Sequence, residues 1–200
     1  MSYAIEIRPI TPEEILQERP KIDAEVRDMA LSAKIADSPE KLIIRDLMPR
    51  DLYDPFHGKT DVTLALANNY QWKWTWSGAT AGSEVTLIEV PANVLQDWSR
   101  AVKIFYLALY DPNPKVSELR FYKENVVAVS VPMDCFDRYG TLLVTFRPRI
   151  GYTKTDTSLK ITAIVEEADG ELWLELGGRA GLPTGIAGEP NPKVIEKGRV

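Results

Sequence analysis

The chain has 200 residues, 44% hydrophobic and 26% charged, an ordinary globular composition with enough apolar residues for one sizeable core. This length allows one domain, or one domain with arms. The net charge of −5 and the isoelectric point near 5.1 argue against direct nucleic-acid binding, which is typical of a basic surface or stripe. The longest strongly apolar stretches, such as IFYLALY, are too short to span a bilayer, so no membrane partner is expected.

Two features bear on where the protein is made. The first residues, MSYAIEIRPITPEE, have neither the charged nor the apolar region of a signal peptide. The single cysteine, Cys135, excludes an intramolecular disulfide framework, and its apolar and acidic neighbours indicate a buried structural thiol. We therefore expect synthesis in a reducing cytoplasm.

A helix is predicted to begin near the N-terminus. Thr11 is suited to be its N-cap, Pro12 takes the first helical position, and Glu14 closes a capping box. Ile10 and Ile15 are placed to form a hydrophobic staple around this start.

Further along this helix, Pro20 is expected to interrupt or restart it, because proline lacks an amide hydrogen and clashes with the preceding turn. Beyond Pro20, an apolar stripe at helical spacing is formed by Ile22, Val26, Met29 and Ala33. The opposite face is charged, so the apolar face must dock on another surface. The residues expected to dock this N-terminal helical arm are Ile15, Ile22, Val26 and Met29.

From residue 61 the apolar period changes to two, which is typical of strands. The candidate strands cover residues 61–67, 70–77, 83–90, 101–110, 118–123, 125–131, 141–149, 158–166 and 171–176. Asp169-Gly170 is a hairpin signal before the last of them, and PANVLQDWSR fits one short helix with Trp98 facing the core. Short strands at this spacing predict a mainly β protein, an antiparallel β-sandwich of jelly-roll type with about eight strands.

The last part of the chain, from Gly177, reads GGRAGLPTGIAGEPNPKVIEKGRV. Gly and Pro dominate it and no period is visible, so it cannot build a core of its own. We therefore divide the chain into a helical arm and connector (1–60), a β-sandwich domain (61–176) and an irregular C-terminal tail (177–200).

The search for catalytic chemistry gives no catalytic, cofactor-binding or metal-binding residue. The only histidine, His57, lies in a loop without the motif of a nucleophilic triad. The segment EEADGELWLE concentrates carboxylates, and a sandwich glycosidase would use two of them across a cleft. Glu171 and Glu175 would share a strand face with Trp173, which suits sugar binding, but the solvated outer face of an edge hairpin is the simpler interpretation.

Two other groups invite a binding interpretation. The loop residues Asp111, Asn113 and Glu118 carry oxygen ligands suited to calcium, although its two prolines favour a plain rigid turn. Arg147 and Arg149 stand two apart near a strand end and could grip an anion, although a strand edge or an inter-subunit salt bridge is the commoner role.

The most conspicuous segment is YQWKWTWS. Tyr70, Trp72, Trp74 and Trp76 alternate with polar residues, so in a strand their rings share one face. Three uses stay open for this face: a core covered by the other sheet or the arm, a subunit interface, or a platform on which carbohydrate stacks.

We expect a non-enzymatic structural assembly protein, a viral or phage virion component such as a capsid, decoration or tail subunit, that associates through its arms. This expectation rests on the β-sandwich, the two arms and the missing catalytic constellation. It implies a homo-oligomer or larger protein assembly, located in the virion or in the cytoplasm of the producing cell. The alternative is a carbohydrate-binding β-sandwich module that uses Tyr70, Trp72, Trp74 and Trp76.

Overall fold

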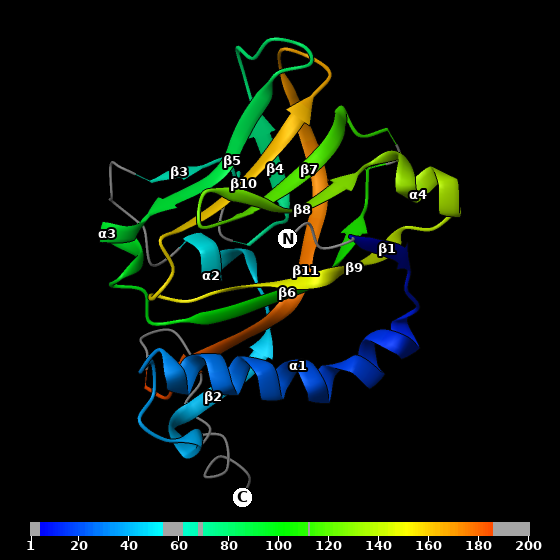
Figure 1. Ribbon diagram of the computed structural model, residues 1–200. Coiled ribbons are helices and arrows are strands. Elements are labelled where there is room, and N and C mark those ends of the chain that lie inside the picture. Colours follow the sequence, from blue (N-terminus) through cyan, green and yellow to red (C-terminus); the bar gives the residue numbers. More distant parts are fainter. Residues whose placement is uncertain (1–4, 54–61, 68–69, 112, 186–200) are drawn as a thin grey trace, which may run out of the picture.

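The computed structural model describes residues 5–53, 62–67, 70–111 and 113–185. The protein is mainly β, with two antiparallel sheets and few helices (Figure 1). The strands are β1 (Glu6–Pro9), β2 (Leu42–Asp46), β3 (Thr63–Leu64), β4 (Lys73–Trp76), β5 (Glu84–Pro91), β6 (Ala101–Leu109), β7 (Val116–Lys123), β8 (Val126–Pro132), β9 (Leu143–Tyr152), β10 (Ser158–Val165) and β11 (Gly170–Pro183). The helices are α1 (Pro12–Ser32), α2 (Pro49–Tyr53), α3 (Ala92–Leu95) and α4 (Asp134–Tyr139), with a 3-10 turn at Pro39–Lys41.

The strand order defines the two sheets. Sheet A has the order β1-β9-β6-β11-β2, and β4 pairs with the beginning of β11 while β2 pairs with its end. Sheet B has the order β3-β5-β10-β7-β8. The pairing between β4 and β11 is nested: β7 pairs with β8, β6 with β9, β5 with β10 and β4 with β11. Along the chain, the β7–β8 pair is therefore innermost, and the β6–β9, β5–β10 and β4–β11 pairs enclose it one after another.

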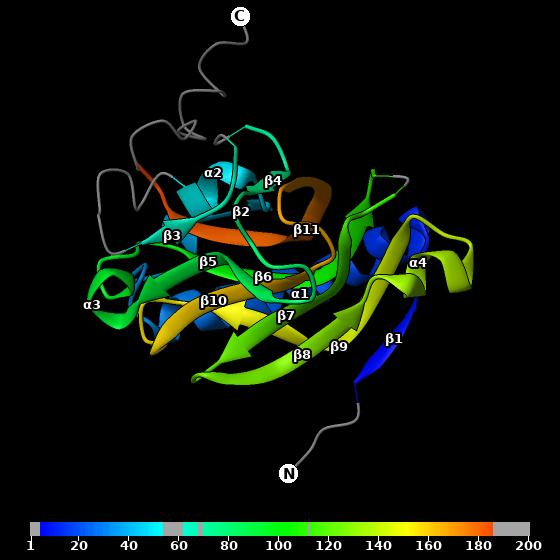
Figure 2. The same cartoon turned by 90° about the horizontal axis from the view of Figure 1, so that it is seen from above.

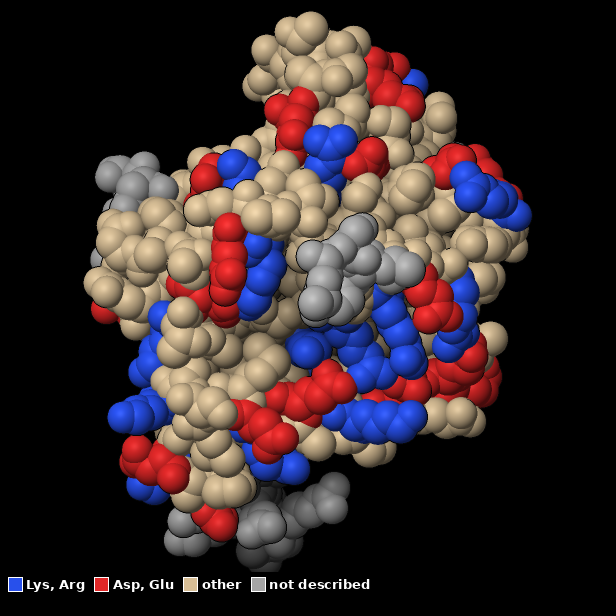
Figure 3. Space-filling view, in the orientation of Figure 1, with Lys and Arg blue, Asp and Glu red and all other residues tan. Residues whose placement is uncertain are grey.

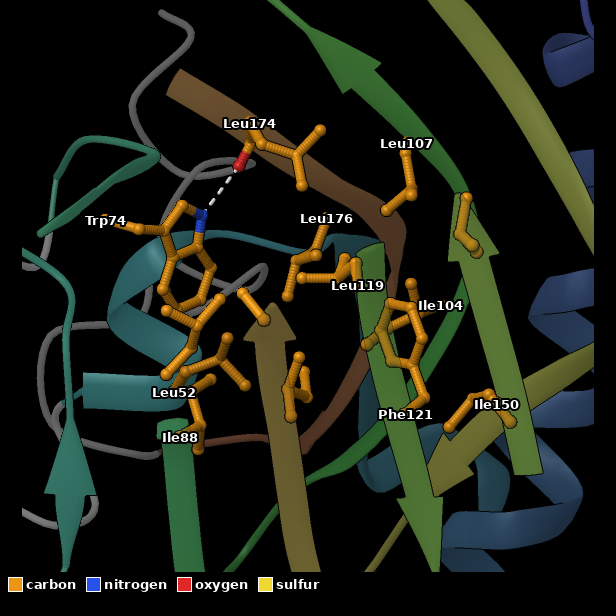
Figure 4. Close-up of a cluster of buried hydrophobic side chains, with 14 of the residues drawn as sticks. Leu52, Trp74, Ile88, Ile104, Leu107, Leu119, Phe121, Ile150, Leu174 and Leu176 are labelled. Carbon is orange, nitrogen blue, oxygen red and sulfur yellow. Dashed lines mark hydrogen bonds between the residues drawn. The ribbon is translucent and has the colours of Figure 1, made fainter. Parts of the chain in front are cut away.

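The main core lies between the two sheets (Figure 4). Sheet B contributes residues such as Ile88 and Leu119, and sheet A contributes residues such as Ile104 and Leu174. The rings of Phe121 on β7 and Phe146 on β9 stack across the gap with centroids 5.3 Å apart. Burial of these alternating side chains explains why the period of two predicted the strands.

Helix α1 packs on the outer face of sheet A, on the side away from sheet B (Figures 1 and 2). It begins as predicted, because the Thr11 side chain accepts a hydrogen bond from the Glu14 amide and the Glu14 carboxylate accepts one from the Thr11 amide. At Gly181 of β11, a Cβ atom would lie 2.8 Å from Cγ1 of Val26. The absence of a side chain at Gly181 therefore lets the helix approach the sheet.

The prediction that Pro20 interrupts this helix is wrong. Helix α1 is continuous through Pro20 from Pro12 to Ser32. Proline removes one hydrogen bond from the helix interior. Apolar contacts and ion pairs hold α1 against sheet A on the far side of Pro20 as well as before it.

The predicted strands are largely present, with differences at their ends. In the segment predicted from residue 61, β3 is limited to Thr63–Leu64, and residue 61 lies outside the described residues. Strands β1 and β2 were missed and lie within the predicted arm and connector, and β11 continues through Gly177 to Pro183, into the predicted tail. The short helix α3 and the buried Trp98 are confirmed.

The hairpin predicted at Asp169-Gly170 is wrong. Strand β10 pairs with β5 and β7 in sheet B, whereas β11 pairs with strands of sheet A, so the connection crosses between the sheets. Both edges of β10 are already occupied, which leaves no place for β11 beside it. The Asp169 carboxylate instead accepts a hydrogen bond of 2.8 Å from the Gly78 amide. Within the described ranges, no helix is long and apolar enough to cross a membrane.

Candidate functional site

The aromatic segment contributes mainly to the core. Trp74 is fully buried, and its indole N–H donates a hydrogen bond of 2.8 Å to the carbonyl oxygen of Leu174 (Figure 4). Trp72 and Trp76 are half-buried and pack against the same core, whereas Tyr70 is 80% exposed. A glycan or a second subunit could therefore contact only Tyr70 and the exposed parts of Trp72 and Trp76, and such a role stays a prediction.

The residues predicted to dock the helical arm lie against the same chain. Ile22 and Val26 have no exposed surface and Ile15 is buried, in a cluster with Ala101 and Phe105 of β6. Met29 is half-buried at the margin of this cluster. A contact of α1 with a second copy would have to use its outer face, and it stays a prediction.

Several carboxylates of the 166–175 segment have partners in the fold: Asp169 accepts from the Gly78 amide, and Glu171 and Glu175 are bound by side chains. The Glu171 carboxylate lies 2.6 Å from the Lys73 ammonium, whose hydrogen bond lowers the pKa of Glu171. Glu175 accepts hydrogen bonds from the hydroxyls of Tyr106 and Tyr110 at 3.0 and 2.8 Å. Burial and the neighbouring Glu175 raise the pKa of Tyr110 to about 12. A glycosidase acid needs a raised carboxyl pKa, which is the opposite of the shift at Glu171.

The other predicted site residues are not assembled into a metal centre in the described part of the chain. The Asp111 carboxylate accepts a hydrogen bond from the Asn113 amide, and Glu118 binds Arg120 and Ser130 on the face of sheet B. Among the described residues, no group of three or more His, Cys, Asp or Glu side chains could hold a metal ion. His57 lies outside the described residues.

Cys135 is buried on α4, which confirms the predicted burial. Desolvation raises the pKa of its thiol to about 11. The thiol is therefore protonated at neutral pH and unsuited to nucleophilic attack.

The two arginines of β9 differ in their surroundings. Arg149 is largely buried between β9 and α1, where it forms ion pairs with Glu18 and Glu25. Lys103 of β6 also binds Glu25, at 3.2 Å. Arg147 is exposed and forms no ion pair within 4 Å among the described residues. An anion site at these arginines stays a prediction, and the ion pairs of Arg149 with α1 of its own chain were not predicted.

A groove lies where the two sheets open, between β8, the end of β9 and α1. It consists of two adjoining hollows that share Lys123, Arg149 and Gly151. The apolar hollow has a volume of about 690 Å³. Its lining is mainly aliphatic, with one carboxylate, that of the exposed Glu124; the aliphatic residues are Ile5, Val126, Val127, Ala128, Pro148 and Ile150. The polar hollow has a volume of about 520 Å³. Besides the shared residues, it is lined by polar and charged side chains, those of Lys103, Ser32, Thr153, Thr155, Asp28 and Asp156. Figure 3 shows Lys and Arg side chains gathered near the centre of this face, with Asp and Glu beside them.

Local sequence explains why the groove is open. Strand β1 pairs with β9 only as far as Arg147, because the next residue, Pro148, has no amide hydrogen to donate. Strand β8 pairs only with β7, and its sequence VVAVSVP carries no charge. Natural edge strands commonly carry charges that discourage further pairing. The uncharged sequence of β8 therefore leaves aliphatic side chains at the mouth of the groove.

Lys123 bridges the two sheets at this mouth. Its ammonium donates a hydrogen bond of 2.6 Å to the Gly151 carbonyl on β9 and forms an ion pair with Asp156. The Asp156 carboxylate also accepts a hydrogen bond of 2.7 Å from the Thr153 amide. Sequence reasoning missed Lys103, Lys123 and Asp156, because no motif links residues so far apart in the chain.

Comparison with known proteins adds no assignment: no family model, no curated protein and no solved structure matches this chain.

Proposed function

We propose that the protein is a non-enzymatic structural assembly protein of a viral or phage particle, a capsid, decoration or tail subunit built on an eight-stranded jelly-roll β-sandwich. The observation that carries this proposal is the nested pairing of β4 to β11. A jelly roll is a long antiparallel hairpin rolled up so that its strands fall into two sheets. The partial orders β4-β11-β6-β9 and β5-β10-β7-β8 fit that description.

Jelly rolls occur in viral capsid domains, but also in lectins and in other proteins, so the fold alone does not decide the function. Two observations favour assembly over catalysis. The chain has one histidine. In the richest acidic segment, the carboxylates that have partners are bound by the side chains of Lys73, Lys115, Tyr106 and Tyr110 and by the Gly78 amide. The carbohydrate alternative has less support, because Trp74 is buried in the core.

The structure changes which of the two arms can bind a neighbouring subunit. Helix α1 covers sheet A of its own chain, so its apolar stripe is not free to bind a neighbour. The segment after β11 is rich in Gly and Pro and cannot form a core by itself. We assign inter-subunit contact to this C-terminal segment, residues 184–200. The proposed partners are copies of the same chain or other particle proteins, without direct nucleic-acid or membrane contact, in the virion or in the cytoplasm of the producing cell.

Light scattering of the full chain at several concentrations tests the proposal. We expect a closed oligomer or a larger assembly whose mass rises with concentration. A chain that ends at residue 185 should lose this association, while its circular dichroism and urea midpoint should stay unchanged. A full chain that is strictly monomeric at every concentration would contradict the proposal.

A further inference from the structure

We propose that the groove between β8, β9 and α1 binds an amphipathic anion, an apolar chain joined to a negatively charged head that forms hydrogen bonds. The chain would occupy the apolar hollow, and the head would occupy the polar one. The inference does not rest on the oligomeric state, because all residues of the groove belong to one chain.

The apolar hollow has the size and lining of a small-molecule site. Its volume of about 690 Å³ falls within the range of ligand pockets, roughly 300–1,000 Å³. Val126 is 67% exposed and Val127 39% exposed, while Ile150 at the back of the hollow is buried. A ligand chain that covers these valines would remove aliphatic surface from water, which is favourable in proportion to its area.

The polar hollow presents cations whose positions are fixed by the protein. Glu25 holds Lys103 and Arg149, and Asp156 holds Lys123. The Lys123 ammonium has three donors, of which two bind Gly151 and Asp156. It also lies 5.1 Å from the centroid of the Tyr152 ring, so a ligand would compete with that ring for the third donor. Hydrogen bonds from such cations to an anionic oxygen are roughly twice as strong as neutral ones.

The carboxylates around these cations determine where in the groove an anionic head can bind. Asp28 is exposed and lines the polar hollow, where it repels an anionic head. Arg147 lines neither of these two hollows; it is exposed in an adjoining hollow, together with Glu25, Lys103, Pro148 and Arg149. The head is therefore expected to lie between Lys123 and Arg149, away from Asp28 and toward the hollow that Arg147 lines.

The two hollows have a common wall, and this adjacency identifies the ligand class. Lys123, Arg149 and Gly151 border both hollows, so the head and the chain of one molecule can occupy them together. A free inorganic anion would use only the polar hollow, and a neutral alcohol only the apolar one. An amphipathic anion uses both.

Calorimetric titration of the full chain with octyl phosphate, below the concentration at which it forms micelles, tests the proposal. We expect saturable binding at one site per chain, at least about tenfold tighter than that of 1-octanol or of inorganic phosphate. Equal binding of 1-octanol would reduce the site to an apolar hollow, and equal binding of phosphate would indicate an adventitious ion only. Either result, or no saturation, would overturn the proposal.

Variants locate the site and keep the test independent of folding. Val126→Asp places a charge in the apolar hollow, and Arg147→Gln removes an unpaired cation. Each should weaken octyl phosphate binding about tenfold, and Asp28→Asn should strengthen it. The matched controls Leu142→Asp and Arg27→Gln change exposed residues outside the groove and should leave binding unchanged. If the controls weaken binding as much as Val126→Asp and Arg147→Gln do, the ligand does not bind in this groove.

Discussion

At the scale of single residues, the aromatic segment divides into a core residue and a surface residue. Trp74 is fully buried and bonded to Leu174, whereas Tyr70 is 80% exposed. Trp74→Ala should lower the free energy of unfolding by about 3–5 kcal/mol, because it leaves a cavity and an unbonded carbonyl. Tyr70→Ala should change it by less than about 0.5 kcal/mol. Urea denaturation of both variants measures the difference, and equal effects would show that Trp74 does not support the core.

Glu84 gives a residue-scale prediction on pH. Burial raises its pKa, but hydrogen bonds from Thr162, Tyr122 and Arg120 outweigh burial and lower the pKa below its ordinary value of 4.5. A lowered carboxyl pKa contributes stability above the ordinary value and loses it as the pH falls through the folded-state pKa. Glu84→Gln should therefore be less stable than the natural chain at pH 7, with the gap closing below about pH 4.5. Urea midpoints at a series of pH values test this, and a gap that does not narrow as the pH falls below 4.5 would contradict it.

At the scale of elements, β11 joins sheet A together, since it pairs with β6 on one side and with β4 and β2 on the other. Its pairing with β6 is shifted between Gly177 and Gly178, and a Cβ atom at Gly178 would lie 2.2 Å from the Lys103 carbonyl oxygen. That carbonyl belongs to the backbone of a central strand and cannot move aside without disturbing the sheet.

Gly178→Ala should therefore destabilise the protein by about 1–3 kcal/mol or more. Gly151 on β9 provides a matched comparison, because its added Cβ would meet only flexible side chains, Met29 at 2.6 Å and Lys103 at 3.2 Å. Gly151→Ala should cost less than Gly178→Ala. Thermal unfolding of both variants decides the order, and the reverse order would refute the account of the shifted register.

Whether a strand could be predicted depended on how clearly its sequence shows an apolar period or run. Strands β7 and β8 alternate buried and more exposed residues, whereas β6 and β10 are buried at most positions and form apolar runs. Both patterns made these strands visible in the sequence. Strands β1 and β2 are only four and five residues long, too short for a period to stand out. The end of β11 was missed because GGRAGLP has few side chains to show a pattern, although its small residues are what α1 and β6 pack against.

At the scale of the whole molecule, periodicity shows which side chains face inward but not which strands pair. The connection at Asp169-Gly170 resembled a hairpin locally, yet it crosses between sheets because both edges of β10 are taken. The same limit applies to the groove. Lys103, Lys123 and Arg149 come from three strands and two sheets, so only the assembled fold brings them together.

The nested pairing also predicts how the chain folds. Within the nest, β7 and β8 are joined by two residues, Glu124 and Asn125, both with positive φ, at 51° and 62°. The pair between β4 and β11 encloses the other three pairs of the nest, so its closure loses more chain entropy than theirs. The β7–β8 hairpin is therefore expected to form before the β4–β11 pair.

Glu124→Val places a β-branched residue at positive φ and should destabilise the protein by about 1–2 kcal/mol. If the hairpin forms early, this loss appears as folding that is about five- to thirtyfold slower, with little change in the unfolding rate. Leu172→Ala, in the buried part of β11 that pairs with β4, should instead mainly accelerate unfolding. Stopped-flow folding and unfolding rates in urea separate the two patterns. Slower folding for Leu172→Ala with faster unfolding for Glu124→Val would show that the outer pair forms first.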